Sequence, residues 1–153
     1  MLLCNRRYMI LGAAALAGCG FTPLYGPENS PAQWALPDVT TAQAHLFHNA
    51  LISEGIDDNP NGTALQYRIN TTEDSIGQIA DGSEARRNIQ GEVVIWRSDD
   101  PQNKITLRAF TGYDASGAAV AVRAAKLDAE ARLMTLLARQ TALQLTLWQR
   151  ARR

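Results

Sequence analysis

A long, unbroken helical pattern occupies residues 120–148 of this 153-residue chain, and it limits the folds open to the remainder. The stretch contains no glycine or proline, and its apolar residues recur every three or four positions, as on one face of an α-helix. The predicted apolar stripe consists of Leu127, Ala131, Met134, Ala138, Leu145 and Trp148, widened by Leu133, Leu136, Leu137 and Leu143. Such a helix must bury this stripe against a second layer of structure.

Three segments before this helix alternate apolar and polar residues, which is typical of half-buried β-strands. The predicted strands are residues 64–70, 86–97 and 104–113. We expect the first strand to continue through Ile76 and Ile79, with an irregularity at Gly77. Strands that follow one another in this way predict an antiparallel meander, in which neighbours in sequence are neighbours in the sheet.

The connections between these strands carry turn residues. Asp81-Gly82 is a hairpin signal between the first two strands. Residues 98–103, which include Asp99, Asp100 and Pro101, predict a longer hairpin loop between the second and third.

Two shorter elements precede the strands. Residues 33–39 predict a short strand at a sheet edge, because Pro37 cannot donate a ladder hydrogen bond. A helix is predicted after Thr40-Thr41, which can cap its first turn, and Gly55 is expected to end it. Its apolar face consists of Ala44, Phe47, Ala50 and Leu51. Residues 33–153 thus predict a single two-layer α+β domain, an antiparallel β-meander sheet packed on one face by two helices.

The N-terminus reads as an export signal that ends at a cysteine. Arg6 and Arg7 precede an apolar run at residues 8–16, which is about half the length that a transmembrane helix needs. Leu16-Ala-Gly-Cys19 matches the cleavage and acylation sequence of bacterial lipoproteins. Residues 1–18 are therefore predicted to be a lipoprotein signal peptide, and Cys19 is predicted to carry the lipid.

The anchor predicts where the protein resides. Cys19 would carry a diacylglyceryl group with palmitate-type chains, and two or more acyl chains hold a protein stably on a membrane. Gly20 stands where an Asp usually retains lipoproteins at the inner membrane, so we expect a periplasm-facing protein of the outer membrane. Residues 19–32, with three Pro and two Gly, predict a tether. Cys4 is expected to leave with the signal, so no disulfide is predicted.

Charge argues against nucleic acid as a partner. The chain has 15 basic and 15 acidic side chains, and loss of Arg6 and Arg7 with the signal leaves 13 basic against 15 acidic. A mildly acidic mature domain lacks the basic surface that nucleic-acid binding requires.

The sequence contains no recognisable catalytic, cofactor or metal-binding pattern, so we expect no enzyme activity, no cofactor and no bound metal. His45 and His48 are three residues apart on a predicted helix and could place two ligands on one metal, but no further ligands cluster beside them. Two surface histidines are the simpler interpretation. Glu73 and Asp74 are adjacent on a strand, so we expect them on opposite faces and solvated.

Three arginines are the candidate ligand-binding residues. Arg86 and Arg87 follow a predicted hairpin turn, and we expect Arg68 to lie near them across the strands. Together they could meet the phosphate groups of a lipid. Ordinary exposed strand charges are the alternative interpretation.

The sequence around the anchor, Gly18-Cys-Gly-Phe-Thr-Pro-Leu-Tyr-Gly26, resembles that of the LPS-assembly lipoprotein (LptE) family in its shorter alphaproteobacterial form. The resemblance extends over nearly the whole chain in the order of its features. These are Asp81-Gly82 before Arg86-Arg87, a strand ending in Trp96-Arg97, a strand running into Thr111-Gly-Tyr-Asp114, and a closing helix containing Ala124-Ala-Lys-Leu-Asp-Ala-Glu-Ala-Arg132.

The resemblance implies a non-enzymatic function. It implies a plug and assembly partner inside the large outer-membrane β-barrel LptD, forming a heterodimer that delivers lipopolysaccharide to the outer leaflet, with lipopolysaccharide as a further ligand. Only Cys19 is carried over as a site. The alternative is a free-standing periplasmic lipoprotein that binds a small ligand or an envelope polymer, which predicts a concave apolar pocket. A lipid-anchored enzyme using His45 or His48 is a third interpretation, which the missing catalytic set disfavours.

Overall fold

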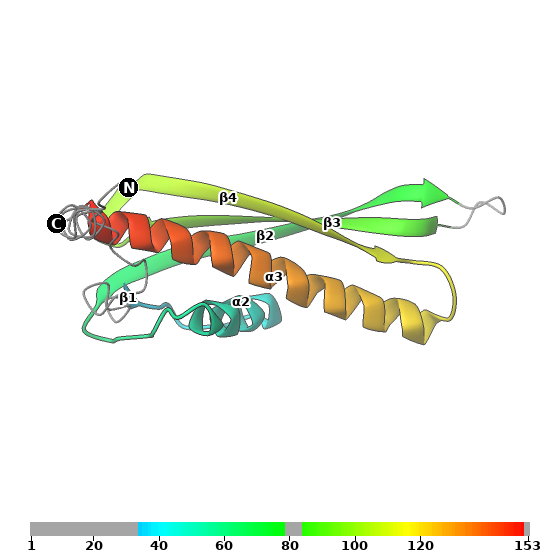
Figure 1. Ribbon diagram of the computed structural model, residues 1–153, viewed down its shortest axis with the longest axis horizontal. Helices are drawn as coiled ribbons and strands as arrows, with labels where there is room; N and C mark the ends of the chain where they lie inside the picture. The colour runs from blue at the N-terminus through cyan, green and yellow to red at the C-terminus, as the bar shows by residue number, and fades with distance from the viewer. Residues whose placement is uncertain (1–33, 79–83, 152–153) are drawn as a thin grey trace, which may run out of the picture. The chain divides into compact units, whose positions relative to one another are not determined.

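The computed structural model of the protein describes residues 34–78 and 84–151, which belong to a unit spanning Pro31–Arg153 (Figure 1). The elements, in chain order, are β1 (Trp34–Ala35), α2 (Ala42–Ser53), β2 (Thr63–Gln78), β3 (Glu84–Arg97), β4 (Asp100–Asp114) and α3 (Ala119–Arg150). The predicted signal, residues 1–18, the predicted tether, residues 19–32, and the turn expected at Asp81-Gly82 lie outside the described residues.

The sheet has the strand order β1-β2-β3-β4. β2, β3 and β4 pair antiparallel, which confirms the predicted meander. β1 is the short edge strand, but it pairs parallel to β2 through Trp34–Thr63 and Ala35–Ala64, so the sheet is mixed. The register of β2 against β3 shifts on both sides of Gly77, which confirms the expected irregularity.

The long loop predicted at residues 98–103 is wrong. β4 already begins at Asp100, which pairs with Arg97, and a register shift in the β3–β4 ladder follows. The Arg97 guanidinium lies 3.3 Å from a carboxylate oxygen of Asp99 and 3.3 Å from one of Asp100, and these ion pairs hold the turn tight. Pro101 is tolerated here because β4 is an edge strand, whose outer side needs no ladder hydrogen bond.

Both helices pack on one face of the sheet, which confirms the predicted α+β fold (Figure 1). α3 has 32 residues, about 48 Å at 1.5 Å per residue. β4 has 15 residues, about 50 Å at 3.3–3.4 Å per residue, so the helix matches the strands in length. At Gly91 of β3 an added Cβ would lie 2.9 Å from Leu137 and 3.0 Å from Leu133, so the helix approaches the sheet closely there.

Part of the predicted helix stripe is turned to solvent. Leu127, Leu136 and Leu143 are 57%, 41% and 50% exposed, whereas we expected them in the core. Three small residues outside the predicted stripe are buried instead, namely Ala129, Thr141 and Ala142, whereas Ala138 of the stripe is buried as expected. The larger side chains that complete the buried face are Leu133, Met134, Leu137 and Leu145. Leu133 and Leu137 contact the sheet at Gly91, where the missing side chain makes room for them.

α2 begins and ends where the sequence predicted. The Thr41 hydroxyl accepts a hydrogen bond from the Ala44 backbone N–H at 3.1 Å. Gly55 follows the helix with φ of +84°, a left-handed conformation in which a side chain is strained. The buried residues are Phe47, Ala50 and Leu51. Within the described residues neither α2 nor α3 is both long and apolar enough to cross a membrane.

Candidate functional site

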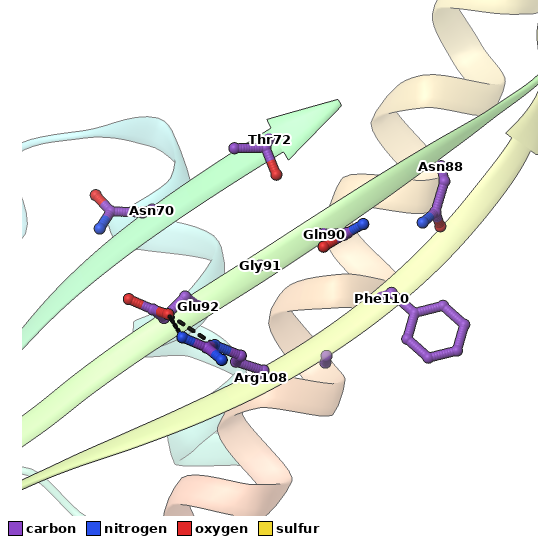
Figure 2. Close-up of a pocket in the computed structure, with 9 residues that line it drawn as sticks. Asn70, Thr72, Asn88, Gln90, Gly91, Glu92, Arg108 and Phe110 are labelled. Atoms are coloured by element: carbon purple, nitrogen blue, oxygen red, sulfur yellow. Dashed lines mark hydrogen bonds and ion pairs between the residues drawn. The ribbon is translucent and has the colours of Figure 1, made fainter. Parts of the chain in front are cut away.

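The face of the sheet opposite the helices carries rows of side chains, most of them polar, from three neighbouring strands (Figure 2). The rows are Asn70–Glu92–Arg108, Thr72–Gln90–Phe110 and Asp74–Asn88–Gly112. Alternate residues of a strand lie about 7 Å apart, so the rows form a regular polar grid. We call this surface, from Gln66 to Asp74 on β2 and across β3 and β4, the open face.

A hollow of about 650 Å³ lies on the open face. Its walls are amide, hydroxyl, charged and aromatic side chains, and its floor includes the backbone at Gly91 and Ala109. The side chains are Asn70, Thr72, Asn88, Gln90, Glu92, Arg108 and Phe110. It combines many hydrogen-bonding groups with one aromatic ring, and most of its lining surface is apolar, so it suits a ligand that has both polar groups and an apolar face.

The charged side chains of this hollow are paired with each other. Arg108 Nη2 and Nε each lie 2.8 Å from Glu92 Oε2, and Figure 2 shows the two side chains side by side at one end of the hollow. Phe110 is 73% exposed, unusually open for an aromatic side chain. The hollow therefore presents neutral polar groups and an uncovered ring.

The covered face holds a second polar group, which we call the Glu73 cluster: Glu73, Arg87, Tyr113 and Lys126. Glu73 Oε1 accepts hydrogen bonds from Arg87 Nη1 at 3.0 Å and from the Tyr113 hydroxyl. Lys126 Nζ of α3 lies 2.5 Å from Glu73 Oε2. The expectation that Glu73 is solvated is therefore wrong, because the register brings a basic strand residue and α3 against it. Asp74 is exposed, as expected.

These contacts set the titration of the cluster. The hydrogen bond from Lys126, followed by that from Tyr113, lowers the pKa of Glu73 to about 2 from its ordinary value of 4.5. The same bond to Glu73 raises the pKa of Lys126. Burial, then the hydrogen bond to Glu73, raises the pKa of Tyr113. The cluster fastens β2, β3, β4 and α3 together while Glu73 is ionised.

The three candidate arginines do not form one site. Arg86 and Arg87 are adjacent on β3 and point to opposite faces, and Arg87 is held in the Glu73 cluster. Arg68 pairs with Val94 of β3. Val94 is eight residues from Arg86 on the same strand, so Arg68 and Arg86 lie about 27 Å apart along the strand direction. Arg68 lies exposed on the open face beside the hollow.

Arg86 lines a second hollow of about 430 Å³, where β3 and β4 meet α3. Arg132 Nε lies there 3.0 Å from Asp128 Oδ2, and Asp114 completes the charged lining. Hydrogen bonds from the Ser116 hydroxyl and backbone N–H lower the pKa of Asp114. Two arginines thus face two carboxylates, and this balance does not favour an anion.

The histidines lie on α2, with His45 exposed and His48 half-buried. Among the residues that the structure describes, no group of three or more His, Cys, Asp or Glu side chains could hold a metal ion.

Sequence reasoning missed both the hollow and the Glu73 cluster. The polar residues of the open face could be recognised in the sequence, because they are the residues that alternate with the apolar ones in each strand. The rows appear only once the strand register is known, because a shift of one residue would place those side chains in the core.

The architecture is that of a mixed four-stranded sheet with two helices on one face, and solved structures of bacterial lipoproteins share it. A candidate lipoprotein of Caulobacter crescentus CB15 is 16% identical, with a TM-score of 0.59, covering 82% of this chain and 96% of that one. The rare lipoprotein B of Shewanella oneidensis is 12% identical, with a TM-score of 0.57 and coverages of 78% and 96%. A minor lipoprotein of Acinetobacter baumannii is 18% identical, with a TM-score of 0.53 and coverages of 76% and 90%.

At these identities the likeness establishes a common fold. No protein-family model matches the sequence, and a search of curated proteins finds no significant relative.

Proposed function

We propose that this chain is a lipid-anchored protein of the outer membrane that acts as the plug and assembly partner of an LptD-type β-barrel in lipopolysaccharide transport. It acts without catalysis, through its fit inside the barrel. The lipid on Cys19 holds it at the membrane, and the domain faces the periplasm. Lipopolysaccharide is its further ligand.

The observation that carries this proposal is the open face. The lumen of an outer-membrane barrel is polar, so a plug must present hydrogen-bonding groups on the surface that meets the barrel wall. The open face does so over three strands, with amide, hydroxyl and paired charged side chains. A long sheet with one polar, uncovered face suits enclosure in a wet cavity.

Two further observations support the proposal. The fold is shared with solved lipoproteins, one of them a rare lipoprotein B, over most of each chain. The sequence around Cys19 is that of a lipid anchor, and it resembles the anchor of the LptE family. Fold and anchor are independent features of the chain, and both favour an envelope lipoprotein.

The hollow favours a second candidate function, that of a free-standing periplasmic lipoprotein that binds a small ligand or an envelope polymer. This alternative predicted a concave apolar pocket with a few polar groups. The hollow fits it in part, since most of its lining side chains are polar but most of its lining surface is apolar. This alternative needs no barrel partner. The proteins that co-purify with this chain therefore distinguish the two functions.

The test is affinity purification of the acylated protein from detergent-solubilised envelopes, followed by mass spectrometry. The proposal predicts one large β-barrel in near-equal amount. A protein that is recovered alone would contradict the plug and favour the free-standing alternative. A purification from cells expressing Cys19→Ala is the control for contacts that form only after solubilisation.

A further inference from the structure

We propose that the hollow on the open face is a saccharide-binding site, which takes the neutral sugar rings of an envelope oligosaccharide. Its residues are Asn70, Thr72, Asn88, Gln90 and Phe110, with the Glu92–Arg108 pair at one end. With the core of lipopolysaccharide as ligand the inference rests on the proposed function and deepens it, and with a cell-wall glycan it goes beyond it. Free saccharide can be tested on the protein without a barrel.

The polar side chains of the hollow match the hydroxyl groups of a sugar. Each hydroxyl both donates and accepts, and a side-chain amide offers two donors and an acceptor in one plane. Asn70, Asn88 and Gln90 supply three amides from two neighbouring strands, and Thr72 adds a hydroxyl. Among the residues that the structure describes, no ion pair or hydrogen bond engages these four side chains, so no internal bond must break for them to turn toward a ligand.

Phe110 supplies the apolar part of the recognition. One face of a pyranose ring consists largely of C–H groups, and it packs on an aromatic ring. Phe110 is 73% exposed and stands in the row of Thr72 and Gln90. The next position on this side of β4 is Gly112, where Arg86 Nε lies 3.7 Å from the place that a Cβ would take, so Arg86 bounds the hollow beyond the ring. Figure 2 shows Asn88, Gln90 and Phe110 around this part of the hollow.

The charges of the hollow favour a neutral ligand over a phosphate. Arg108 is the only cation among the residues that line it, and Glu92 holds its guanidinium at 2.8 Å through both Nε and Nη2. A phosphate would have to displace this carboxylate or accept its repulsion. A sugar hydroxyl can instead bond to the outer lone pairs and N–H groups of the intact pair.

The envelope offers two sources of this chemistry, the core saccharide of lipopolysaccharide and the glycan strand of the cell wall. The probes are a core oligosaccharide stripped of acyl chains and phosphate, and the tetramer of N-acetylglucosamine. Each is titrated by calorimetry into the full acylated chain in detergent micelles, with and without excess inorganic phosphate.

We expect one of the two probes to bind, phosphate to leave the affinity unchanged, and Phe110→Ala or Gln90→Ala each to weaken binding at least tenfold. The probe that binds identifies the source. Leu127→Ala and Gln102→Ala are the matched controls, because they remove an exposed apolar and an exposed amide side chain outside the hollow. Unchanged melting temperatures show that the variants fold.

Three results would overturn the inference: binding of neither saccharide, binding that both hollow variants retain, or binding that phosphate displaces. Recovery of the barrel is measured separately, so failure here leaves the plug and assembly part of the proposed function standing.

Discussion

Glu73 is the centre of the polar contacts on the face of the sheet that the helices cover. Its two carboxylate oxygens take hydrogen bonds from two strands and one helix, through Arg87, Tyr113 and Lys126. Its pKa of about 2 means that these partners bind the ionised carboxylate far better than the protonated one. The contact lies where α3 has few buried residues, before Ala129, so it holds the first turns of the helix to the sheet.

This arrangement predicts an acid-sensitive contribution to stability. The folded-state pKa of Glu73 lies below its ordinary 4.5, so the contribution is full above pH 4.5 and is lost as the pH falls toward 2. We expect Glu73→Gln to lower the free energy of unfolding at pH 6 by about 1–2 kcal/mol, allowing for the partly exposed partners. Urea titrations at pH 6 and pH 3 measure both effects.

The variant should also show a smaller loss of stability between those two pH values than the natural protein. Asp74→Asn is the control, since it removes the neighbouring exposed carboxylate. An equal pH dependence in the natural protein and in Glu73→Gln would show that the cluster does not contribute.

Gly91 is the point of closest approach between β3 and α3. A valine there would place its side chain against Leu137 and Leu133, where even a Cβ comes within 2.9–3.0 Å. We expect Gly91→Val to lower the free energy of unfolding by about 1–3 kcal/mol through overpacking. In Gly77→Val the new Cβ meets nothing within 4 Å, so chemical denaturation of both variants should separate crowding from the general effect of replacing glycine.

At the scale of elements, α3 acts as a brace along the whole sheet. Its C-terminal end is fixed by Trp148, which is half-buried and whose ring centroid lies 6.0 Å from that of Trp34 in β1. Trp34 is 2% exposed, so the contact seals the end of the core.

Truncation of this contact should destabilise the domain. We expect Trp148→Ala to cost about 2–3 kcal/mol, below the roughly 3–5 kcal/mol of a fully buried aromatic residue, because Trp148 keeps part of its surface in water. Leu147→Ala, next to it and 55% exposed, is the control. Thermal melts of both variants measure the loss. Equal melting temperatures would mean that packing of the last turns of α3 does not stabilise the domain.

The elements themselves could be predicted from sequence because their signals are local. Alternation predicted the strands that carry Leu65, Val93 and Ile95, which are buried, and the Thr41 and Gly55 caps bounded α2. Relations between elements could not be predicted in the same way. The exposure of Leu136 follows from how α3 is rotated on the sheet, and the environment of Glu73 follows from a lysine 53 residues away. The parallel pairing of β1 with β2 likewise depends on how two distant segments meet, and no residue pattern within either segment predicts it.

At the scale of the whole molecule, the domain has two unlike sides. The side with the helices encloses the core, and the open face presents polar rows and the hollow (Figures 1 and 2). A sheet with one polar face is stable in water, and a partner that surrounds the domain would cover the open face and the outer sides of the helices together.

Membrane attachment is predicted to depend on one atom, the Cys19 sulfur. We expect Cys19→Ala to move the protein from the membrane fraction to the soluble fraction, because no acyl chain can then be added. Cys4→Ala should remain membrane-bound, since Cys4 is predicted to leave with the signal. Fractionation of envelopes tests both, and membrane retention of Cys19→Ala would refute the anchor.

The central claim is that the domain is enclosed by its partner, and photo-crosslinking in living cells tests it most directly. A photoreactive residue is placed at Thr106 on the open face and, separately, at Asn49 on the outer side of α2, both of which are exposed. Enclosure predicts that both positions crosslink to the same large outer-membrane barrel. Crosslinks from one position only would mean that the domain docks by one side, and crosslinks from neither would contradict the plug altogether.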